Sequence, residues 1–320
     1  MNIEPYANDP GHWGASLVTL SEVLLDLLDA VAPASVLEIG AYAGDVTRLL
    51  LQWSATSGAK ITAVDPDPEK PLVALDAEQS DLVLVRATSH EALADPDVPI
   101  GEVVIIDGDH NYYTVSEELR LIAERSGTPL PLLIFHDVSW PHARRDDYFA
   151  PELVPEDYRQ PTVEGGAVFP GDPGLHPGGL PYKWPAAREG GPRNGVLTAV
   201  EDFVAAHQGL RLAVVPAFFG LGVAWPESAP WSAAVADIVA PWDRHPMLER
   251  MEANRVMHLA YSHHMMVEAA RWQQRSARQE ALLRKLLESK SFSVAERISQ
   301  LRQGGEPAIS KAEVRRALAD

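Results

Sequence analysis

One segment sets the architecture of this chain: Val36-Leu-Glu-Ile-Gly-Ala-Tyr-Ala-Gly-Asp45. An apolar run ends at Glu38, glycines follow at positions 40 and 44, and a helix-like segment begins near Asp45. A glycine turn after a strand lets the backbone approach a ligand closely, and the helix that follows offers its free N–H groups at the same place. The segment therefore predicts the first strand, turn and helix of a nucleoside-binding half-domain.

A second apolar run, residues 61–64, ends in Asp65, twenty-one residues after Gly44. A carboxylate at the end of the second strand can bind the two hydroxyls of a ribose. The glycine spacing is Glu-x-Gly-x-x-x-Gly, and it differs from the G-x-G-x-x-G of dinucleotide sites. An acid before the turn would repel a pyrophosphate, but it could hold an ammonium group through the turn or a water. The pattern favours the methionine end of S-adenosylmethionine over NAD.

At these residues the chain resembles the class I S-adenosylmethionine-dependent methyltransferases. The predicted contacts to the methyl donor come from the ends of the first four strands: Glu38, Gly40, Tyr42, Gly44, Asp65, Thr88, Ser89 and Asp107. Of these, Thr88 and Ser89 should flank the adenine. His12, Trp13 and Ser16 could cover the donor from the N-terminal side.

Short apolar runs alternate with helix-like segments over the first 140 residues. The runs are 36–39, 61–64, 82–86, 103–106 and 132–135. Such alternation is typical of βαβ units with buried parallel strands. A helix at 194–207 and two strands at 210–215 and 220–225 complete the pattern. We therefore predict an α/β fold: a Rossmann-like seven-stranded methyltransferase sheet with a long lid insertion and a C-terminal helical extension.

Residues 138–195 interrupt this pattern with dense proline and glycine. A long insertion inside a compact domain is usually a functional lid or is disordered. Aromatic and charged residues favour a lid here: Trp140, Arg144, Arg145, Tyr148, Tyr182 and Trp184. We assign residues 1–240 to the methyltransferase domain, with the lid at 138–195, and residues 241–320 to the helical extension.

From about residue 246 to residue 289 the chain is helix-like and nearly free of proline and glycine. Apolar residues lie roughly on one stripe: Leu248, Met251, Val256, Leu259, Val267, Ala270, Leu282, Leu283, Leu286 and Leu287. A long helix with such a stripe packs on a partner subunit or back over the sheet. We expect a homodimer that forms through this helix.

The charge of the chain is strongly acidic and uneven. There are 27 Lys and Arg against 45 Asp and Glu, a net charge of −18. Residues 271–320 carry 11 basic and 6 acidic side chains, a net +5, and residues 1–270 carry 16 and 39, a net −23. An acidic body repels nucleic acid and attracts a cationic substrate. A solubilising surface would account for the charge equally well.

The composition argues against several classes of protein. Cysteine is absent, so there is no disulfide framework and no thiol chemistry. No apolar run approaches the roughly 20 residues that span a bilayer, so no membrane partner is expected. The first residues lack a basic segment and an apolar core, so we expect no signal peptide and a cytoplasmic location.

The chemistry should lie where the fourth and fifth strands end, because ligands bind beyond the carboxyl ends of parallel strands. The fourth run leads into Asp107-Gly-Asp-His110 and the fifth into His136-Asp137. Asp107, His136 and Asp137 could bind a divalent cation such as Mg²⁺, and an imidazole tilts the choice toward Mn²⁺, Fe²⁺ or Zn²⁺. His110 could take the proton of the acceptor during attack on the methyl group.

A narrower resemblance rests on Ile106-Asp-Gly-Asp-His-Asn-Tyr112 and Phe135-His-Asp137. Both motifs look like those of the macrocin and mycinamicin sugar O-methyltransferases and the cephalosporin-hydroxylase-like family. The resemblance implies a magnesium ion held by Asp107 and by the pair at 136–137, and His110 as the base. The first member of that pair is normally an acid, whereas this chain has His136. Fewer carboxylates hold Mg²⁺ less well.

The acceptor is predicted from charge. The predicted substrate residues are acids and aromatic residues in or beside the lid: Asp137, Trp140, Asp146, Asp147, Tyr148 and Glu164. Carboxylates pair with ammonium groups, and aromatic rings stack on sugar faces. The leading hypothesis is N-methylation of an aminosugar, an amine of an aminoglycoside, in antibiotic biosynthesis, with His110 or Asp107 removing the proton. In this the chain resembles the N-methyltransferases of gentamicin-type biosynthesis.

Three alternatives stay open at this point. A metal-assisted sugar O-methyltransferase would need the ion to acidify a hydroxyl. A non-catalytic donor-binding protein would bind S-adenosylmethionine without turnover. A nicotinamide oxidoreductase fits the glycine spacing worst.

Overall fold

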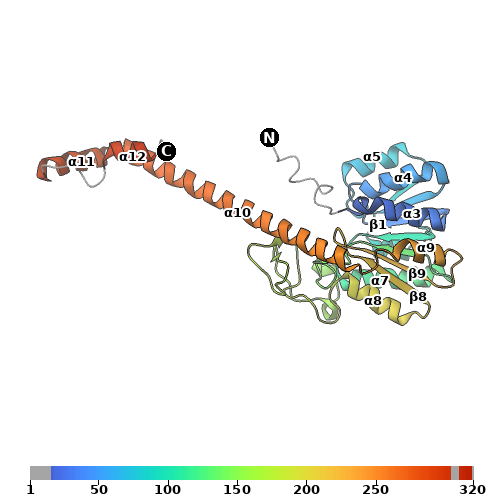
Figure 1. Ribbon diagram of the computed structural model, residues 1–320. Helices are drawn as coiled ribbons and strands as arrows, with labels where there is room; N and C mark the ends of the chain where they lie inside the picture. Colours follow the sequence, from blue (N-terminus) through green and yellow to red (C-terminus); the bar gives the residue numbers. More distant parts are fainter. Residues whose placement is uncertain (1–15, 304–309, 319–320) are drawn as a thin grey trace. The chain divides into compact units, whose positions relative to one another are not determined.

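The computed structural model describes residues 16–303 and 310–318. His12 and Trp13 lie outside the described residues. The chain divides into two units, one up to Tyr261 and one from Ser262 onward. Figure 1 shows the α/β unit and the C-terminal helices. None of the described helices combines the length and the apolar character that a bilayer-spanning segment needs.

A seven-stranded sheet forms the centre of the first unit, and this confirms the predicted fold class (Figure 1). Its strands are β1 Ser35–Ile39, β2 Lys60–Val64, β3 Leu82–Val85, β4 Val103–Ile106, β5 Leu132–Phe135, β8 Leu210–Val215 and β9 Leu221–Pro226. The order is β3-β2-β1-β4-β5-β9-β8. The first five strands pair in parallel, and β9 runs antiparallel to both β5 and β8.

Helices cover both faces of the sheet. One face packs against α3 Ser21–Val31, α4 Asp45–Ser57, α5 Lys70–Glu78 and α9 Ser232–Val239, and the short 3₁₀ helix η1 Leu17–Leu20 precedes α3. The other face packs against α6 Ser89–Ala94, α7 Tyr112–Ser126 and α8 Val196–Ala206. Adjacent strand residues such as Val36 and Leu37 point to opposite faces, and both are buried. Burial on both faces explains why the strands are continuous apolar runs in the sequence.

The insertion at 138–195 is ordered although it has little regular structure. It contains η2 Pro151–Leu153, η3 Glu156–Tyr158 and a two-stranded ribbon, β6 Ala167–Val168 and β7 Leu180–Pro181. Arg145, only 1% exposed, donates to the carbonyl oxygens of Ala186 at 2.6 Å and Pro173 at 2.9 Å. Hydrogen bonds from side chains thus satisfy backbone carbonyls of the insertion that would otherwise need partners in a helix or a sheet.

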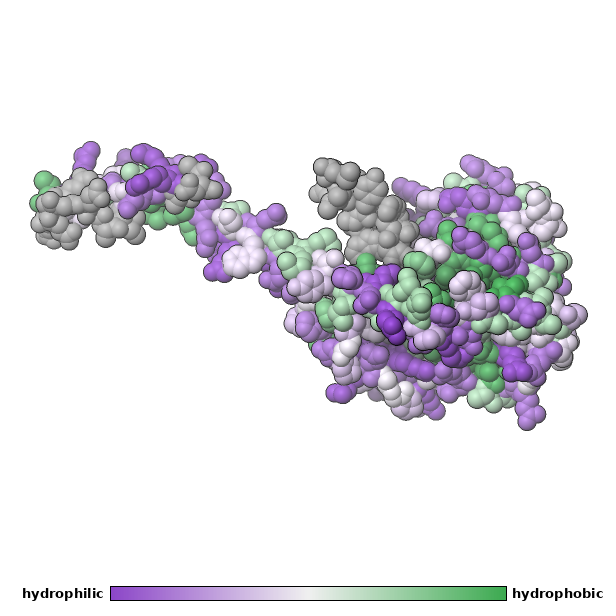
Figure 2. All heavy atoms as spheres, viewed as in Figure 1, coloured by the Kyte–Doolittle hydropathy of each residue, from purple (hydrophilic) through white to green (hydrophobic). Residues whose placement is uncertain are grey.

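The C-terminal helices are α10 Pro246–Glu288, α11 Lys290–Gln303 and α12 Lys311–Ala317. Within the second unit, Ser310 caps α12 and Lys311 Nζ donates to the carbonyl of Leu287 at 2.6 Å. Large apolar side chains along these helices are exposed, among them Met265, Met266, Trp272, Leu282 and Ile298. Figure 2 shows hydrophobic and hydrophilic residues interspersed on the visible side of these helices. The homodimer stays a prediction.

Glu118 on α7 is a buried acid that makes stability depend on pH. It is fully buried, and neither carboxyl oxygen has a hydrogen-bond partner of ordinary geometry among the described residues. Burial raises the pKa of Glu118 to about 8, whereas a glutamate in an unfolded chain titrates near 4.3. As pH rises between these values, the unfolded chain releases a proton that the folded protein keeps, so the free energy of unfolding falls.

We therefore expect Glu118→Gln to stabilise the protein at alkaline pH. The gain should be on the order of 4 kcal/mol at pH 8, or roughly 10 °C in melting temperature, and should fall to a few tenths of a kcal/mol at pH 4. Thermal unfolding followed by circular dichroism at both pH values measures it. Glu124→Gln is the matched control, because this side chain on the same helix is 59% exposed. A melting-temperature gain of equal size at both pH values would contradict the account.

Candidate active site

The turn after β1 brings its backbone against the end of β4. Gly40 has φ +86°, and a Cβ added there would lie 2.1 Å from the carbonyl oxygen of Asp107. Gly44 has φ +81° and is the N-cap of α4. Only glycine combines this conformation with so close an approach. The predicted glycine turn is therefore a structural necessity where strands β1 and β4 end.

Two predicted donor carboxylates flank this turn. Asp65, at the end of β2, accepts the backbone N–H groups of Tyr42 at 2.7 Å and Asp67 at 2.8 Å. Glu38 is 2% exposed and accepts the hydroxyl of Thr47 at 2.6 Å. Burial, reinforced by the negative charges of Asp107 and Asp65, raises the pKa of Glu38 to about 8. A ligand with a positive charge near Glu38 would relieve this cost.

A cavity of about 1050 Å³ opens at the carboxyl ends of the strands. The lining includes seven predicted donor residues: Glu38, Gly40, Tyr42, Asp65, Thr88, Ser89 and Asp107. Gly44 does not line the cavity; as the N-cap of α4, it ends the turn that does. Ser16, His110 and Asp137 also line the cavity. The structure thus brings the predicted donor and catalytic residues into one space.

One wall of the cavity was not predicted from the sequence. Phe149, Leu153 and Val154 of the insertion line it together with Tyr113 of α7 and His90 of α6. The backbone N–H of Phe149 donates to Asp109 Oδ1 at 3.1 Å, so Asp109 fastens the insertion to the loop after β4. These apolar insertion residues follow neither the helix period nor the strand period. Only their position next to Tyr148 in the sequence could have indicated that they line the cavity.

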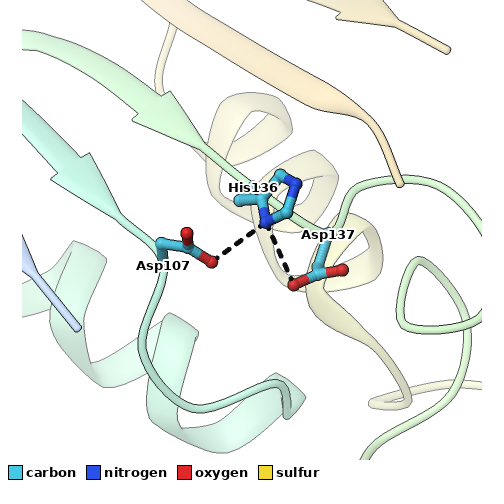
Figure 3. Close-up of side chains that lie close together, drawn as sticks. All are labelled: Asp107, His136 and Asp137. Carbon is cyan, nitrogen blue, oxygen red and sulfur yellow. Dashed lines mark hydrogen bonds and ion pairs between the residues drawn. The ribbon is translucent and has the colours of Figure 1, made fainter. Parts of the chain in front are cut away.

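Three predicted metal ligands lie together where β4 and β5 end (Figure 3). His136 Nδ1 lies 3.1 Å from Asp107 Oδ1 and 3.4 Å from Asp137 Oδ2. The three ligand atoms lie within 4.8 Å of one another. Two carboxylates and one imidazole that converge at such distances fit a divalent transition metal better than Mg²⁺. Burial opposes charge on His136, but the Asp107 and Asp137 carboxylates outweigh it and raise the pKa of His136 well above the usual value.

His110 lies on the cavity side of this cluster. Its Nε2 is 3.0 Å from Asp137 Oδ2, and its ring stacks on His142 with centroids 4.6 Å apart. Burial opposes protonation, but Asp137 and its neighbours prevail and raise the pKa of His110 to about 9. Burial and the charge of His110 lower the pKa of His142 to about 3. The pair is therefore one charged and one neutral imidazole near pH 7.

The predicted substrate residues of the insertion lie elsewhere. Asp146 and Tyr148 are fully buried: Asp146 accepts the N–H groups of Tyr112 and Gly195 and the hydroxyl of Tyr148, at 2.6–2.8 Å. Asp147 accepts the backbone N–H of Trp184 at 2.8 Å. Of the predicted substrate residues only Asp137 lines the cavity, and Trp140, Asp146, Asp147, Tyr148 and Glu164 do not. Asp146 and Tyr148 hold the insertion in place instead, because a buried acid in a loop is most stable where it satisfies backbone donors.

Comparison with known protein families gives a match over part of the chain. Residues 37–138 match the sequence model of a family described as a methyltransferase domain. The search of curated proteins finds no match. Similar solved structures include the S-adenosylhomocysteine-bound methyltransferase PaMTH1 of Podospora anserina, with 13% identity, 69% of this chain and 83% of that chain covered, and a TM-score of 0.43.

Two further similar structures carry O-methyltransferase titles. A putative caffeoyl-CoA O-methyltransferase from Staphylococcus aureus has 10% identity, coverage of 65% and 83%, and a TM-score of 0.42. A putative O-methyltransferase from Klebsiella pneumoniae has 16% identity, coverage of 70% and 86%, and a TM-score of 0.41.

The methyltransferase-domain match runs from within β1 to just past β5, which is the part of the chain that builds the donor side of the cavity. The glycine turn and Asp65, the acid that follows β2, both lie within the matched segment. The same segment supplies the five parallel strands of the seven-stranded sheet. Residues 37–138 are thus the methyltransferase domain of this chain, and S-adenosylmethionine is the methyl donor that the residues around the glycine turn fit.

Proposed function

We propose that this enzyme N-methylates an amine of a cationic aminosugar, such as an aminoglycoside, in antibiotic biosynthesis. The observation that carries the proposal is the charge of the cavity. Nine acidic residues line it, of which Glu38 keeps its proton near pH 7, and the described lining includes no Lys or Arg; the nine are Glu38, Asp45, Asp65, Asp67, Glu69, Glu91, Asp107, Asp109 and Asp137. The donor carries a sulfonium and an ammonium group, and the remaining negative charge suits a cationic acceptor.

The size of the cavity supports binding of both substrates. Small-molecule pockets span about 300–1,000 Å³, and this cavity of about 1050 Å³ lies just above that range. With the donor on the turn at Gly40, the acceptor would occupy the space between His110, Asp137 and the insertion wall at Phe149. An aromatic ring there can pack on a sugar face.

An ammonium acceptor must lose a proton before its nitrogen can attack the methyl group. His110, which lines the cavity, is the base that we assign to this step. An ammonium group bound beside Asp137 offsets the negative charge that keeps a proton on His110, so it lowers the pKa of His110 and frees the imidazole to accept. Asp137, 3.0 Å from His110 Nε2, orients the ring.

A second candidate function, metal-assisted O-methylation of a sugar, is favoured by the cluster of Asp107, His136 and Asp137. These three residues would hold the ion. A divalent cation bound there would supply Lewis acidity, which makes a hydroxyl acidic enough to attack. His110, which contacts Asp137, would then accept the hydroxyl proton.

One assay separates the two candidates: transfer of labelled methyl from S-adenosylmethionine to a panel of aminoglycosides and neutral glycosides, with and without EDTA. We expect transfer to amine-bearing members, with activity retained in EDTA. Transfer to neutral glycosides alone, abolished by EDTA and restored by Mn²⁺, would replace the amine proposal with the metal-assisted one.

A further inference from the structure

Glu252 is a buried acid on α10 that the chemistry above does not use. It is 7% exposed, and both carboxylate oxygens are fully engaged. Oε2 accepts the backbone N–H of Phe218 at 3.0 Å, and Oε1 accepts that of Phe219 at 2.8 Å. Arg255, one turn further along the helix, donates to both oxygens at 2.6 Å. A carboxylate this well satisfied holds whatever it contacts in one geometry.

The segment that Glu252 contacts needs such support. Phe218, Phe219 and Gly220 have φ values of +53°, +67° and +98°. Two consecutive non-glycine residues in the left-handed region cost about 1–2 kcal/mol each. On its other side the segment is held by Ser139, whose backbone N–H donates to the carbonyl of Phe219 at 2.7 Å. The loop between β8 and β9 is therefore held in a strained shape from α10 and from the chain after β5.

This shape aims the carbonyl of Phe218 at the metal cluster. The Phe218 oxygen lies 3.0 Å from His136 Nε2. A carbonyl only accepts, so Nε2 carries a hydrogen in this arrangement. Nδ1 is then the ring atom that faces Asp107 and Asp137, at 3.1 and 3.4 Å (Figure 3).

We propose that Glu252 is a positioning residue for His136: through the backbone of Phe218 it sets the ring orientation and tautomer that present Nδ1 to Asp107 and Asp137. The cluster is thereby prepared as a site of one nitrogen and two carboxylates, which prefers Mn²⁺, Fe²⁺ or Zn²⁺ to Mg²⁺. The cation preference rests on the second candidate function, whereas the ring orientation stands without it.

The test compares Glu252→Gln with Glu249→Gln, a change at an exposed acid on the same helix. Nitrogen NMR of labelled histidine in the metal-free protein should show His136 protonated at Nε2 at every pH in the wild type and in Glu249→Gln. Glu252→Gln should add the Nδ1-protonated tautomer and weaken Mn²⁺ binding, measured by calorimetry, by about 10–100-fold. The dissociation constant for S-adenosylhomocysteine should stay unchanged.

A double-mutant cycle separates positioning from general loosening. His136→Asp replaces the imidazole with a carboxylate ligand, whose coordination does not depend on a hydrogen bond to the Phe218 carbonyl. In the His136→Asp background, Glu252→Gln should therefore no longer change the affinity for Mn²⁺. Equal losses in both backgrounds, or a wild-type tautomer in Glu252→Gln, would overturn the proposal. If Glu252→Gln does not fold, Glu252→Asp takes its place, since the shorter side chain keeps the charge but cannot reach both amides. Absence of Mn²⁺ binding in the wild type would overturn the cation preference alone, and the tautomer would still decide the positioning role.

Discussion

His110→Asn lowers the turnover number of methyl transfer by about 10²–10⁴-fold, the range that a general base contributes. Asparagine keeps a hydrogen-bond donor toward Asp137 but cannot accept a proton at the pH of the assay. The binding of S-adenosylmethionine should change by less than about threefold, because an interaction made only in the transition state leaves the ground state alone.

The measurement is single-turnover transfer at saturating donor, with the acceptor found in the panel, together with the donor dissociation constant from calorimetry. His90→Asn is the matched control. His90 also lines the cavity, but it lies on α6 and its Nε2 is 3.1 Å from the carbonyl of Thr114. That control should alter donor binding more than turnover. Turnover within about tenfold of the wild type in His110→Asn would remove His110 from the mechanism.

Gly40→Ala abolishes donor binding and lowers the free energy of unfolding by about 3 kcal/mol or more. Two penalties coincide here: φ is +86°, and the added Cβ meets the Asp107 carbonyl at 2.1 Å. The atom it meets is backbone, so no side-chain rotation relieves the clash. Either β1 or β4 must shift, and the donor and catalytic residues at their ends shift with them.

Urea unfolding and calorimetric titration with S-adenosylhomocysteine measure both effects. Gly58→Ala is the control, since Gly58 has a similar φ of +77° and nothing within 4 Å of the added Cβ. It should cost only about 1 kcal/mol, the strain of the left-handed conformation by itself. Equal costs for the two variants would show that the backbone contact between Gly40 and Asp107 carries no weight.

The donor half of the site could be predicted from the sequence because its causes are local. Buried parallel strands must be short apolar runs, so β4 and β5 begin and end where the runs do. Glycine must occupy the turn at Gly40, and the carboxyl ends of all the parallel strands meet at one edge of the sheet. Glu38, Asp65, Asp107 and Asp137 therefore meet although they lie far apart along the chain.

Only the tertiary structure showed which residues hold the insertion in place and which residue supports His136. Asp146 and Tyr148 resemble surface groups in the sequence, yet they are fully buried and hold the insertion through backbone amides. Glu252 reads as a solvent-facing helix residue, but it binds a loop more than 30 residues away. Local sequence patterns report which residues avoid water, because burial follows the period of a helix or strand. They do not report which buried acid satisfies which distant amide, because that partner is chosen only when the elements pack together.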